Sequence, residues 1–163
     1  MTILVFGGSQ GATFINQTFC EAAKLLKFPF QVIHLTGKED LEVKYSVSAI
    51  VKPFEEEMEA AYEVADMVVC RCGAGTTAEL IRHQKPAVVI PYPYAYGHQE
   101  KNGEYLQQGA RILLQKNATA EKLAEEIEQL RINIEMHKQA LKEISLPKTE
   151  EFAELIRKLG AKK

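Results

Sequence analysis

The sequence predicts an α/β domain built on a doubly wound parallel sheet. Short apolar runs recur along the first 116 residues, and stretches with helical spacing or turns rich in glycine and proline separate them. Strands that helices cover on both faces have such uninterrupted apolar runs, and the alternation of strand with helix favours a parallel sheet. We therefore expect one Rossmann-like domain with its core over residues 1–116 and a helical tail over residues 117–163.

The expected elements begin with a strand whose apolar run ends in Gly7-Gly8. The runs predicted as buried parallel strands are residues 2–6, 31–35, 49–51, 67–70 and 87–90, with a last strand over 111–114. The predicted helices cover residues 12–27, 55–65, 76–84, about 119–134 and, after Pro147, about 150–159. The stretch Asn117-Ala118-Thr119 matches a glycosylation sequon, but in a cytoplasmic chain we interpret it as a helix cap. We expect the tail helices to clamp the sheet or to contact a partner.

The composition bounds the function. The chain has 163 residues, of which 46% are hydrophobic, so it can bury one core without the help of a metal or a disulfide. Its 20 lysines and arginines stand against 22 acidic residues, a net charge of -2, which gives no large positive field for nucleic acid. We expect no nucleic-acid partner.

The cysteines and the apolar runs bear on localisation. Cys20, Cys70 and Cys72 are odd in number and no signal-like segment precedes the first strand, which favours a cytoplasmic protein over a secreted disulfide framework. Cys70 and Cys72 have the spacing of half a metal site, but no second pair of Cys or His follows at ligand spacing, so we expect no metal. No run approaches the ~20 apolar residues of a membrane span.

The first candidate site is the turn Gly7-Gly8-Ser9-Gln10-Gly11-Ala12, where the first strand gives way to a helix. Free N–H groups and the positive helix end bind phosphates at this position, although a tight turn that only needs positive φ would also select glycine. It is not a P-loop, because no Gly-Lys-Ser/Thr follows. The second strand ends in His34-Leu35-Thr36-Gly37, where a dinucleotide fold requires an acidic residue for the ribose, and this argues against NAD.

A second glycine-rich turn, Cys72-Gly73-Ala74-Gly75-Thr76-Thr77, follows the strand at residues 67–70 and opens another helix. Two helix N-termini can then converge on one anion at the carboxyl edge of the sheet, an arrangement that suits a diphosphate. Glu79 stands three residues after Thr76, which is the spacing of a capping box. The sequence leaves Glu79 open between a helix cap and a ligand for the two ribose hydroxyls.

A third candidate is the loop over residues 91–99, which is rich in tyrosine and ends in His98-Gln99. Loops at strand ends often carry ligand contacts. His98 is either a general base or, as we prefer, a hydrogen-bonding group. Phe54, directly after Pro53, either stacks on a base or belongs to the core, as apolar residues at the start of a helix usually do.

Together these motifs resemble the C-terminal domain of the MurG family, the UDP-N-acetylglucosamine-dependent transferases that form lipid II from lipid I in bacterial peptidoglycan synthesis. The resemblance covers residues 1–116 with the motifs in order, and the tail agrees only in its helical character. The matching segments are residues 7–12, 34–38, positions within 54–66, 70–79, Pro86, Pro91 and 98–102.

The resemblance implies the GT-B architecture, in which two Rossmann-like domains face each other across a cleft and the C-terminal one holds the donor nucleotide. This chain is similar to that half alone, and its first strand starts at residue 2. We expect that the N-terminal acceptor domain is absent, so the chain binds UDP-GlcNAc but needs a partner that binds lipid I for turnover. The whole enzyme is expected on the cytoplasmic face of the inner membrane, with no cofactor and no metal.

The resemblance also implies roles by matching position. Ser9 and the turn Ala74-Gly75-Thr76-Thr77 would contact the diphosphate. The backbone of Glu55 would read the uracil edge, Glu79 would take the ribose hydroxyls, and Gln99 would bind the N-acetylglucosamine hydroxyls. Further contacts are expected from Gly8, Gln10, Phe54 and His98. No catalytic residue is expected in this domain, because the general base of the family belongs to the N-terminal one.

Two alternatives remain open. One is a non-catalytic sugar-nucleotide-binding module or subunit that kept the pocket, and the other is a domain similar to a UDP-sugar 2-epimerase.

Cys72 and Gly75 depart from the family pattern, which often has serine and a bulkier residue at these positions.

Overall fold

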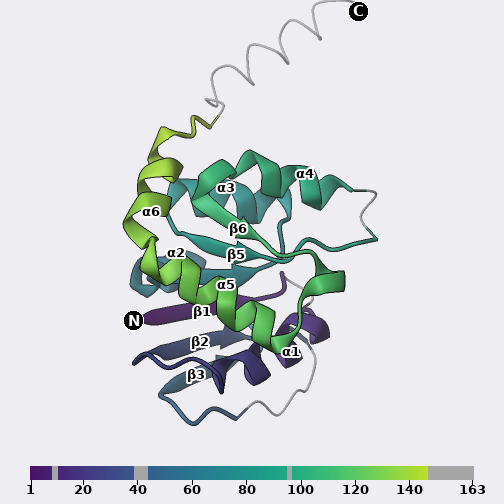
Figure 1. The fold of residues 1–163 in the computed structure, drawn as a ribbon, viewed down its shortest axis with the longest axis vertical. Coiled ribbons are helices and arrows are strands. Elements are labelled where there is room, and N and C mark those ends of the chain that lie inside the picture. The colour runs from purple at the N-terminus through teal and green to yellow at the C-terminus, as the bar shows by residue number, and fades with distance from the viewer. Residues whose placement is uncertain (9–10, 39–43, 95–96, 147–163) are drawn as a thin grey trace, which may run out of the picture.

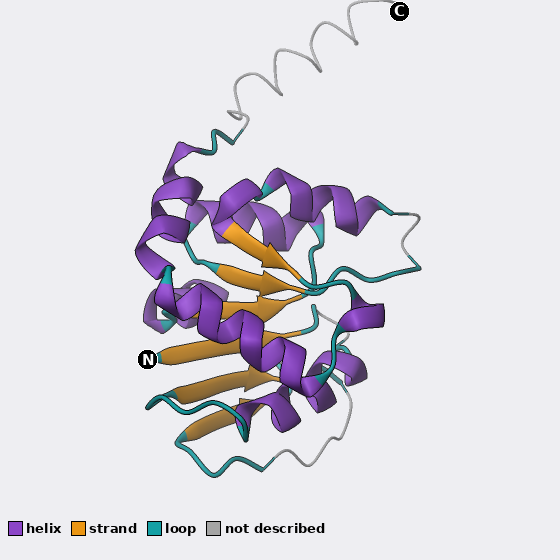
Figure 2. Ribbon diagram, in the orientation of Figure 1, coloured by secondary structure: helices purple, strands orange, loops and turns teal. Residues whose placement is uncertain are grey.

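The computed structural model describes residues 1–8, 11–38, 44–94 and 97–146, which form a six-stranded parallel sheet with helices on both faces (Figures 1 and 2). The strands are β1 (Thr2–Phe6), β2 (Gln31–Leu35), β3 (Ala49–Lys52), β4 (Met67–Cys70), β5 (Ala87–Val89) and β6 (Ala110–Ile112). The α-helices are α1 (Thr13–Ala23), α2 (Met58–Val64), α3 (Ala74–Arg82), α4 (His98–Tyr105), α5 (Ala120–Ile132) and α6 (Ile134–Glu143). Two short 3₁₀ helices, η1 (Gln107–Gly109) and η2 (Gln115–Asn117), flank β6.

The strand order β3-β2-β1-β4-β5-β6 places the first strand in the middle of the sheet. From β1 the chain builds outward through β2 and β3, and it then returns to the other side of β1 to add β4, β5 and β6. Phe6, the last residue of β1, is in register with Leu35 of β2 and with Cys70 of β4. The order therefore reverses between β1 and β4, and open α/β sheets bind ligands outside the carboxyl ends of the strands at such a point.

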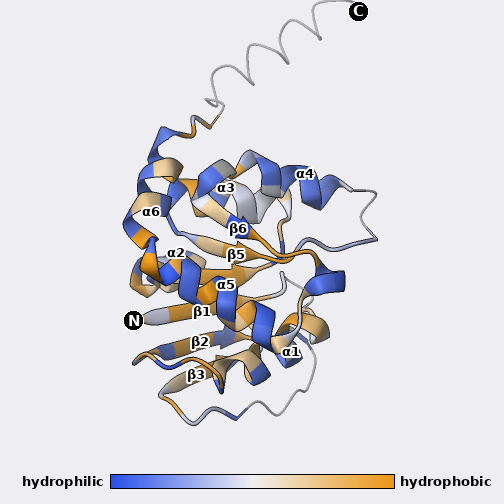
Figure 3. Ribbon diagram, in the orientation of Figure 1, coloured by the Kyte–Doolittle hydropathy of each residue, from blue (hydrophilic) through white to orange (hydrophobic). Residues whose placement is uncertain are grey.

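The core has two layers, one on each face of the sheet. Alternation along β1 sends Ile3 and Val5 into the layer under α1 and α5, and Leu4 and Phe6 into the layer under α2 and α3. Hydrophobic residues are common along the strands, while hydrophilic and hydrophobic residues alternate along the helices (Figure 3). Each fully buried aliphatic side chain in these layers contributes about 1.5–3 kcal/mol to the stability of the fold.

The structure confirms the doubly wound parallel sheet. The bounds of β1, β2 and β4 agree with the prediction, and β6 and β5 differ by one or two residues. The prediction that all strands are buried is wrong for β3, whose four residues are exposed because it pairs only with β2 at the edge of the sheet. The first helix ends at Ala23, ahead of Pro29, and α2 begins three residues later than predicted, at Met58.

The tail forms two helices, α5 and α6, over the described residues. The α5 side chains Leu123, Ile127 and Leu130 are fully buried in the layer that contains α1, so α5 clamps the sheet as predicted. Thr119 caps α5, since its Oγ1 accepts a hydrogen bond from the Lys122 N–H at 3.2 Å. The helix predicted at residues 150–159 lies outside the described residues.

Candidate functional site

The two glycine-rich corners lie side by side at the switch point of the sheet. The first leads from β1 into α1 and the second from β4 into α3, and β1 and β4 are neighbours. Two cavities open there, which we call the Glu79 cavity, of about 390 Å³, and the Gln99 cavity, of about 690 Å³. Gly8, Gly73 and Thr76 line both cavities, so the cavities adjoin one another and share a wall that the two corners form. These volumes are in the range of small-molecule sites.

The first corner is a turn that only glycine can form at its two ends. Gly8 and Gly11 have φ of 92° and 80°, and the Gly11 N–H donates to the Gly8 carbonyl at 3.0 Å. A Cβ atom at Gly11 would lie 2.4 Å from the Thr36 carbonyl oxygen. Ser9 and Gln10 lie outside the described residues, so the diphosphate contacts expected of them stay predictions.

The second corner exposes the N-terminus of α3. The N-cap residue is Gly73, which has no side chain to cap the helix, so the first N–H groups of α3 are open to an anion. Gly75 and Thr76 line the Glu79 cavity, whereas Ala74 lines neither cavity. The Thr77 hydroxyl and N–H both donate to the Gly73 carbonyl, at 3.0 and 2.9 Å, and this side chain is turned into the core.

Glu79 lines its cavity and is held from behind by a buried tyrosine. The Tyr62 hydroxyl donates to Glu79 Oε2 at 2.9 Å, and the Tyr62 ring is stacked on His83 at 4.9 Å. Burial raises the pKa of Tyr62 far above its ordinary value, so the hydroxyl remains a donor. The capping-box reading of Glu79 is wrong, because α3 begins at Ala74 and places Glu79 in its second turn.

Phe54 and Glu55 follow β3, and only Phe54 lines the Glu79 cavity. Phe54 is 58% exposed and lines this cavity together with Pro53 and Met58, so it is not a core residue. Glu55 is not among the lining residues, and its carboxylate pairs with Lys52 at 2.9 Å. This ion pair lowers the pKa of Glu55. The role expected of the Glu55 backbone at a uracil edge remains a prediction.

Gln99 lines the Gln99 cavity and also ties its loops together. Its Oε1 accepts hydrogen bonds from the N–H groups of Cys72 at 3.2 Å and Tyr92 at 2.9 Å. Asn102, one turn later in α4, donates to the Cys72 carbonyl at 3.0 Å. With its oxygen occupied in this way, Gln99 has its amide N–H groups left to offer a ligand. His98 is exposed and lines neither cavity.

Arg71 is a site residue for which sequence reasoning gave no role. It follows β4 directly, is only 8% exposed, and lines the Gln99 cavity beside both corners. Its Nη1 donates to the carbonyls of Ile90 and Pro91, at 3.0 and 3.3 Å, and its guanidinium lies 5.3 Å from the centre of the Tyr92 ring. Burial lowers the pKa of Arg71, yet a guanidinium keeps its charge. No carboxylate within the described ranges forms an ion pair with it.

The cysteines and acidic residues give no sign of a metal centre in the described part of the chain. Cys70 and Cys72 are buried free thiols, and burial raises the pKa of both. The residues that the structure describes contain no group of three His, Cys, Asp or Glu side chains that could hold a metal ion. Within the same residues, no helix combines the length and the apolar composition that a membrane span requires.

The parallel sheet and its paired glycine-rich corners define a Rossmann-like domain of the kind found in GT-B glycosyltransferases. The solved structure of Acinetobacter baumannii MurG is similar over 97% of this chain and 52% of its own, with a TM-score of 0.85 and 30% identity. The calicheamicin glycosyltransferase CalG4 shares the fold, with a TM-score of 0.69 at 14% identity. Residues 2–159 match the glycosyltransferase family 28 C-terminal domain, and the chain belongs to this family.

Curated relatives carry one name, UDP-N-acetylglucosamine–N-acetylmuramyl-(pentapeptide) pyrophosphoryl-undecaprenol N-acetylglucosamine transferase. The protein of Syntrophus aciditrophicus is 43% identical in an alignment of 155 positions that covers 88% of this chain and 42% of the relative. That of Aquifex aeolicus is 34% identical in an alignment of 157 positions that covers 93% of this chain and 46% of the relative. The chain therefore spans less than half the length of these relatives.

Proposed function

We propose that this chain is the UDP-GlcNAc-binding half of an inverting N-acetylglucosaminyltransferase that forms lipid II from lipid I. The observation that carries the proposal is the pair of cavities joined by the two glycine corners, with Glu79 at one end and Gln99 at the other. The names of the relatives support the choice of donor and acceptor.

The linings of the cavities give the donor a direction. The Glu79 cavity has a carboxylate that can accept from both ribose hydroxyls and apolar groups, including Phe54, against which a base can lie. The shared wall at Gly8, Gly73 and Thr76 offers glycine backbone and a helix N-terminus to the diphosphate. The sugar then occupies the Gln99 cavity. The order nucleoside, diphosphate, sugar thus follows the order of the linings along the sheet edge.

The chain's own contribution to the reaction is to hold the donor and to stabilise the leaving group. In the proposed reaction the 4-hydroxyl of the muramyl acceptor attacks the anomeric carbon with inversion, and UDP departs. Negative charge then grows on the diphosphate, beside the N-terminus of α3, the Thr76 hydroxyl and the charged Arg71. Donors fixed in advance in this way supply several kcal/mol of transition-state stabilisation. The general base and the lipid-linked acceptor belong to the N-terminal half, which we place with this chain on the cytoplasmic face of the membrane.

Calorimetric titration of the chain with UDP, UDP-GlcNAc and NADH tests donor binding. We expect UDP and UDP-GlcNAc to bind and NADH to give no heat. Binding of NADH without UDP would overturn the proposal.

Mixing the chain with a separately produced N-terminal domain of the Syntrophus relative tests catalysis. With UDP-GlcNAc and a lipid I analogue, we expect transfer of N-acetylglucosamine to the acceptor. Donor binding without transfer would favour a non-catalytic module, and release of UDP with an epimerised sugar would favour a 2-epimerase.

A further inference from the structure

A network of hydrogen-bonded polar side chains, formed by Tyr45, His34 and Asn16, crosses the layer between α1 and the sheet. Asn16 of α1 and His34 of β2 are 0% exposed, although they lie in a hydrophobic layer. His34 Nδ1 lies 2.7 Å from Tyr45 Oη, and His34 Nε2 lies 3.0 Å from Asn16 Oδ1. Asn16 Nδ2 donates to the Thr36 carbonyl at 2.9 Å. Polar groups buried in this way are costly unless each is paired, and here each one is.

The acceptor at one end of this network, the Thr36 carbonyl, fixes the direction of its hydrogen bonds. The Thr36 carbonyl can only accept, so the Asn16 amide nitrogen must face it and the Asn16 oxygen must face His34. That oxygen can only accept, so His34 carries its proton on Nε2, and Nδ1 accepts from the Tyr45 hydroxyl. Burial lowers the pKa of His34 to about 4, which keeps the ring neutral near pH 7.

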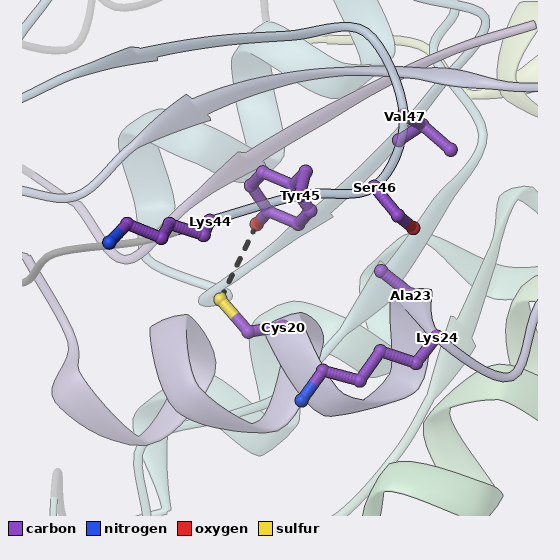
Figure 4. A pocket seen from close by; sticks show the side chains of 7 residues that line it. All are labelled: Cys20, Ala23, Lys24, Lys44, Tyr45, Ser46 and Val47. Carbon is purple, nitrogen blue, oxygen red and sulfur yellow. Dashed lines mark hydrogen bonds between the residues drawn. The ribbon is translucent and has the colours of Figure 1, made fainter.

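At one end, this hydrogen-bonded network contacts the first glycine corner through the Thr36 carbonyl. The Thr36 carbonyl that Asn16 holds is the group against which Gly11 packs, with room for a hydrogen but not for a Cβ, whose position would be 2.4 Å from that oxygen. Gly11 also forms an isolated bridge with Gly37. The other end reaches a surface cavity of about 400 Å³, where Cys20 Sγ lies 3.6 Å from Tyr45 Oη and the two groups point toward one another (Figure 4).

We propose that the Tyr45–His34–Asn16 network is a positioning device. It holds the Thr36 carbonyl against Gly11 and so fixes the backbone conformation of the first glycine corner, where the diphosphate binds. The proposal rests on the proposed function, which assigns the diphosphate to this corner. It gives a role to the segment His34-Leu35-Thr36-Gly37, which matches the family pattern but lines the donor cavities only at Leu35. The three residues act through the backbone, so none of them is a catalytic residue.

Two substitutions of His34 separate positioning from mere stability. His34→Gln places an amide N–H where Nε2–H stood and so keeps the bond to Asn16. His34→Asn places its amide where Nδ1 stood and loses that bond. We expect His34→Gln to bind UDP within about twofold of the unchanged chain and His34→Asn to bind about fivefold or more weakly, as one lost hydrogen bond allows. Uridine, which lacks the diphosphate, should bind both variants equally in an NMR titration.

Three controls make the outcome decisive. Tyr105→Phe removes a hydroxyl that donates to the Ser145 carbonyl at 3.0 Å, and because Tyr105 lines neither the Glu79 cavity nor the Gln99 cavity, UDP affinity should stay unchanged. Urea unfolding of each variant measures any general loss of stability. If both His34 variants are too unstable to titrate, Tyr45→Phe is measured in the same way, with a loss of UDP but not uridine affinity expected.

Equal UDP affinity of the two folded His34 variants, or equal losses for UDP and uridine, would overturn the positioning role. Failure of the unchanged chain to bind UDP would instead overturn the proposed function. In that case the ¹⁵N NMR spectrum of His34 still tests whether the hydrogen-bond network exists, because a neutral ring with its proton on Nε2 is expected with or without ligand.

Discussion

Replacing Glu79 by glutamine tests the ribose site with the smallest change of shape. The amide has the size of the carboxylate, and its oxygen can still accept from the Tyr62 hydroxyl, which now lies 2.9 Å from Oε2. The second oxygen, which we assign to the ribose diol, becomes an amino group. The diol then loses one charged acceptor and meets a donor in its place.

The expected cost follows from that single exchange. A hydrogen bond to a charged group contributes about 1.5–3 kcal/mol, so UDP should bind the Glu79→Gln variant about 10- to 100-fold more weakly. The free energy of unfolding should change by less than about 0.5 kcal/mol, because the buried Tyr62 keeps its partner. Calorimetry with UDP and urea unfolding measure the two quantities.

A matched control separates this effect from a general loss of negative charge. Glu59→Gln makes the same exchange at an exposed ion pair with Arg82 and should leave both quantities unchanged. If UDP and its 2′-deoxy analogue lost affinity equally in Glu79→Gln, or if neither lost any, the assignment of Glu79 to the ribose would be refuted.

Further substitutions and pH test the corners and the buried histidine. Gly11→Ala should lower the free energy of unfolding by about 1–3 kcal/mol in urea, because its φ is 80° and its Cβ would clash with the Thr36 carbonyl. Arg71→Gln should weaken UDP binding about tenfold and leave uridine binding unchanged, since only the diphosphate would meet the lost charge. Urea unfolding between pH 7 and 4 should show a loss of stability that His34→Gln lacks. The native His34, with a pKa of about 4, stays neutral where the unfolded one binds a proton, and the full difference is about 3 kcal/mol.

The sequence was sufficient to predict the sheet where the strands are buried on both sides. The runs that became β1, β2 and β4 are mainly apolar and end at glycine or polar turns, so their bounds were predicted correctly. The same kind of run at Ala49–Lys52 became an exposed edge strand. An apolar run does not show whether a strand has one neighbour or two, because that depends on the position of the strand in the finished sheet.

The place of the candidate site in the fold was predictable where it depends on the backbone and not where it depends on distant side chains. The two glycine corners follow from local sequence, because each is a glycine-rich segment between an apolar run and a stretch of helical spacing. Arg71 gains its place at the Gln99 cavity only from carbonyls about 20 residues away, those of Ile90 and Pro91. The choice between cap and ligand for Glu79 depended on where α3 begins, and helix ends are the least certain feature of a sequence pattern.

Two side chains proposed to meet the donor, Glu79 and Gln99, are already held by hydrogen bonds within the domain, and so is the Thr36 carbonyl behind the first glycine corner. Tyr62 holds Glu79, the N–H groups of Cys72 and Tyr92 hold Gln99, and Asn16 holds the carbonyl behind Gly11. Fixing a free side chain on binding costs about 0.5–1.5 kcal/mol. Because these groups are already fixed in the folded domain, donor binding does not have to supply that free energy. This explains why the residues behind the site, which touch no ligand, should change affinity for specific parts of the donor when they are replaced.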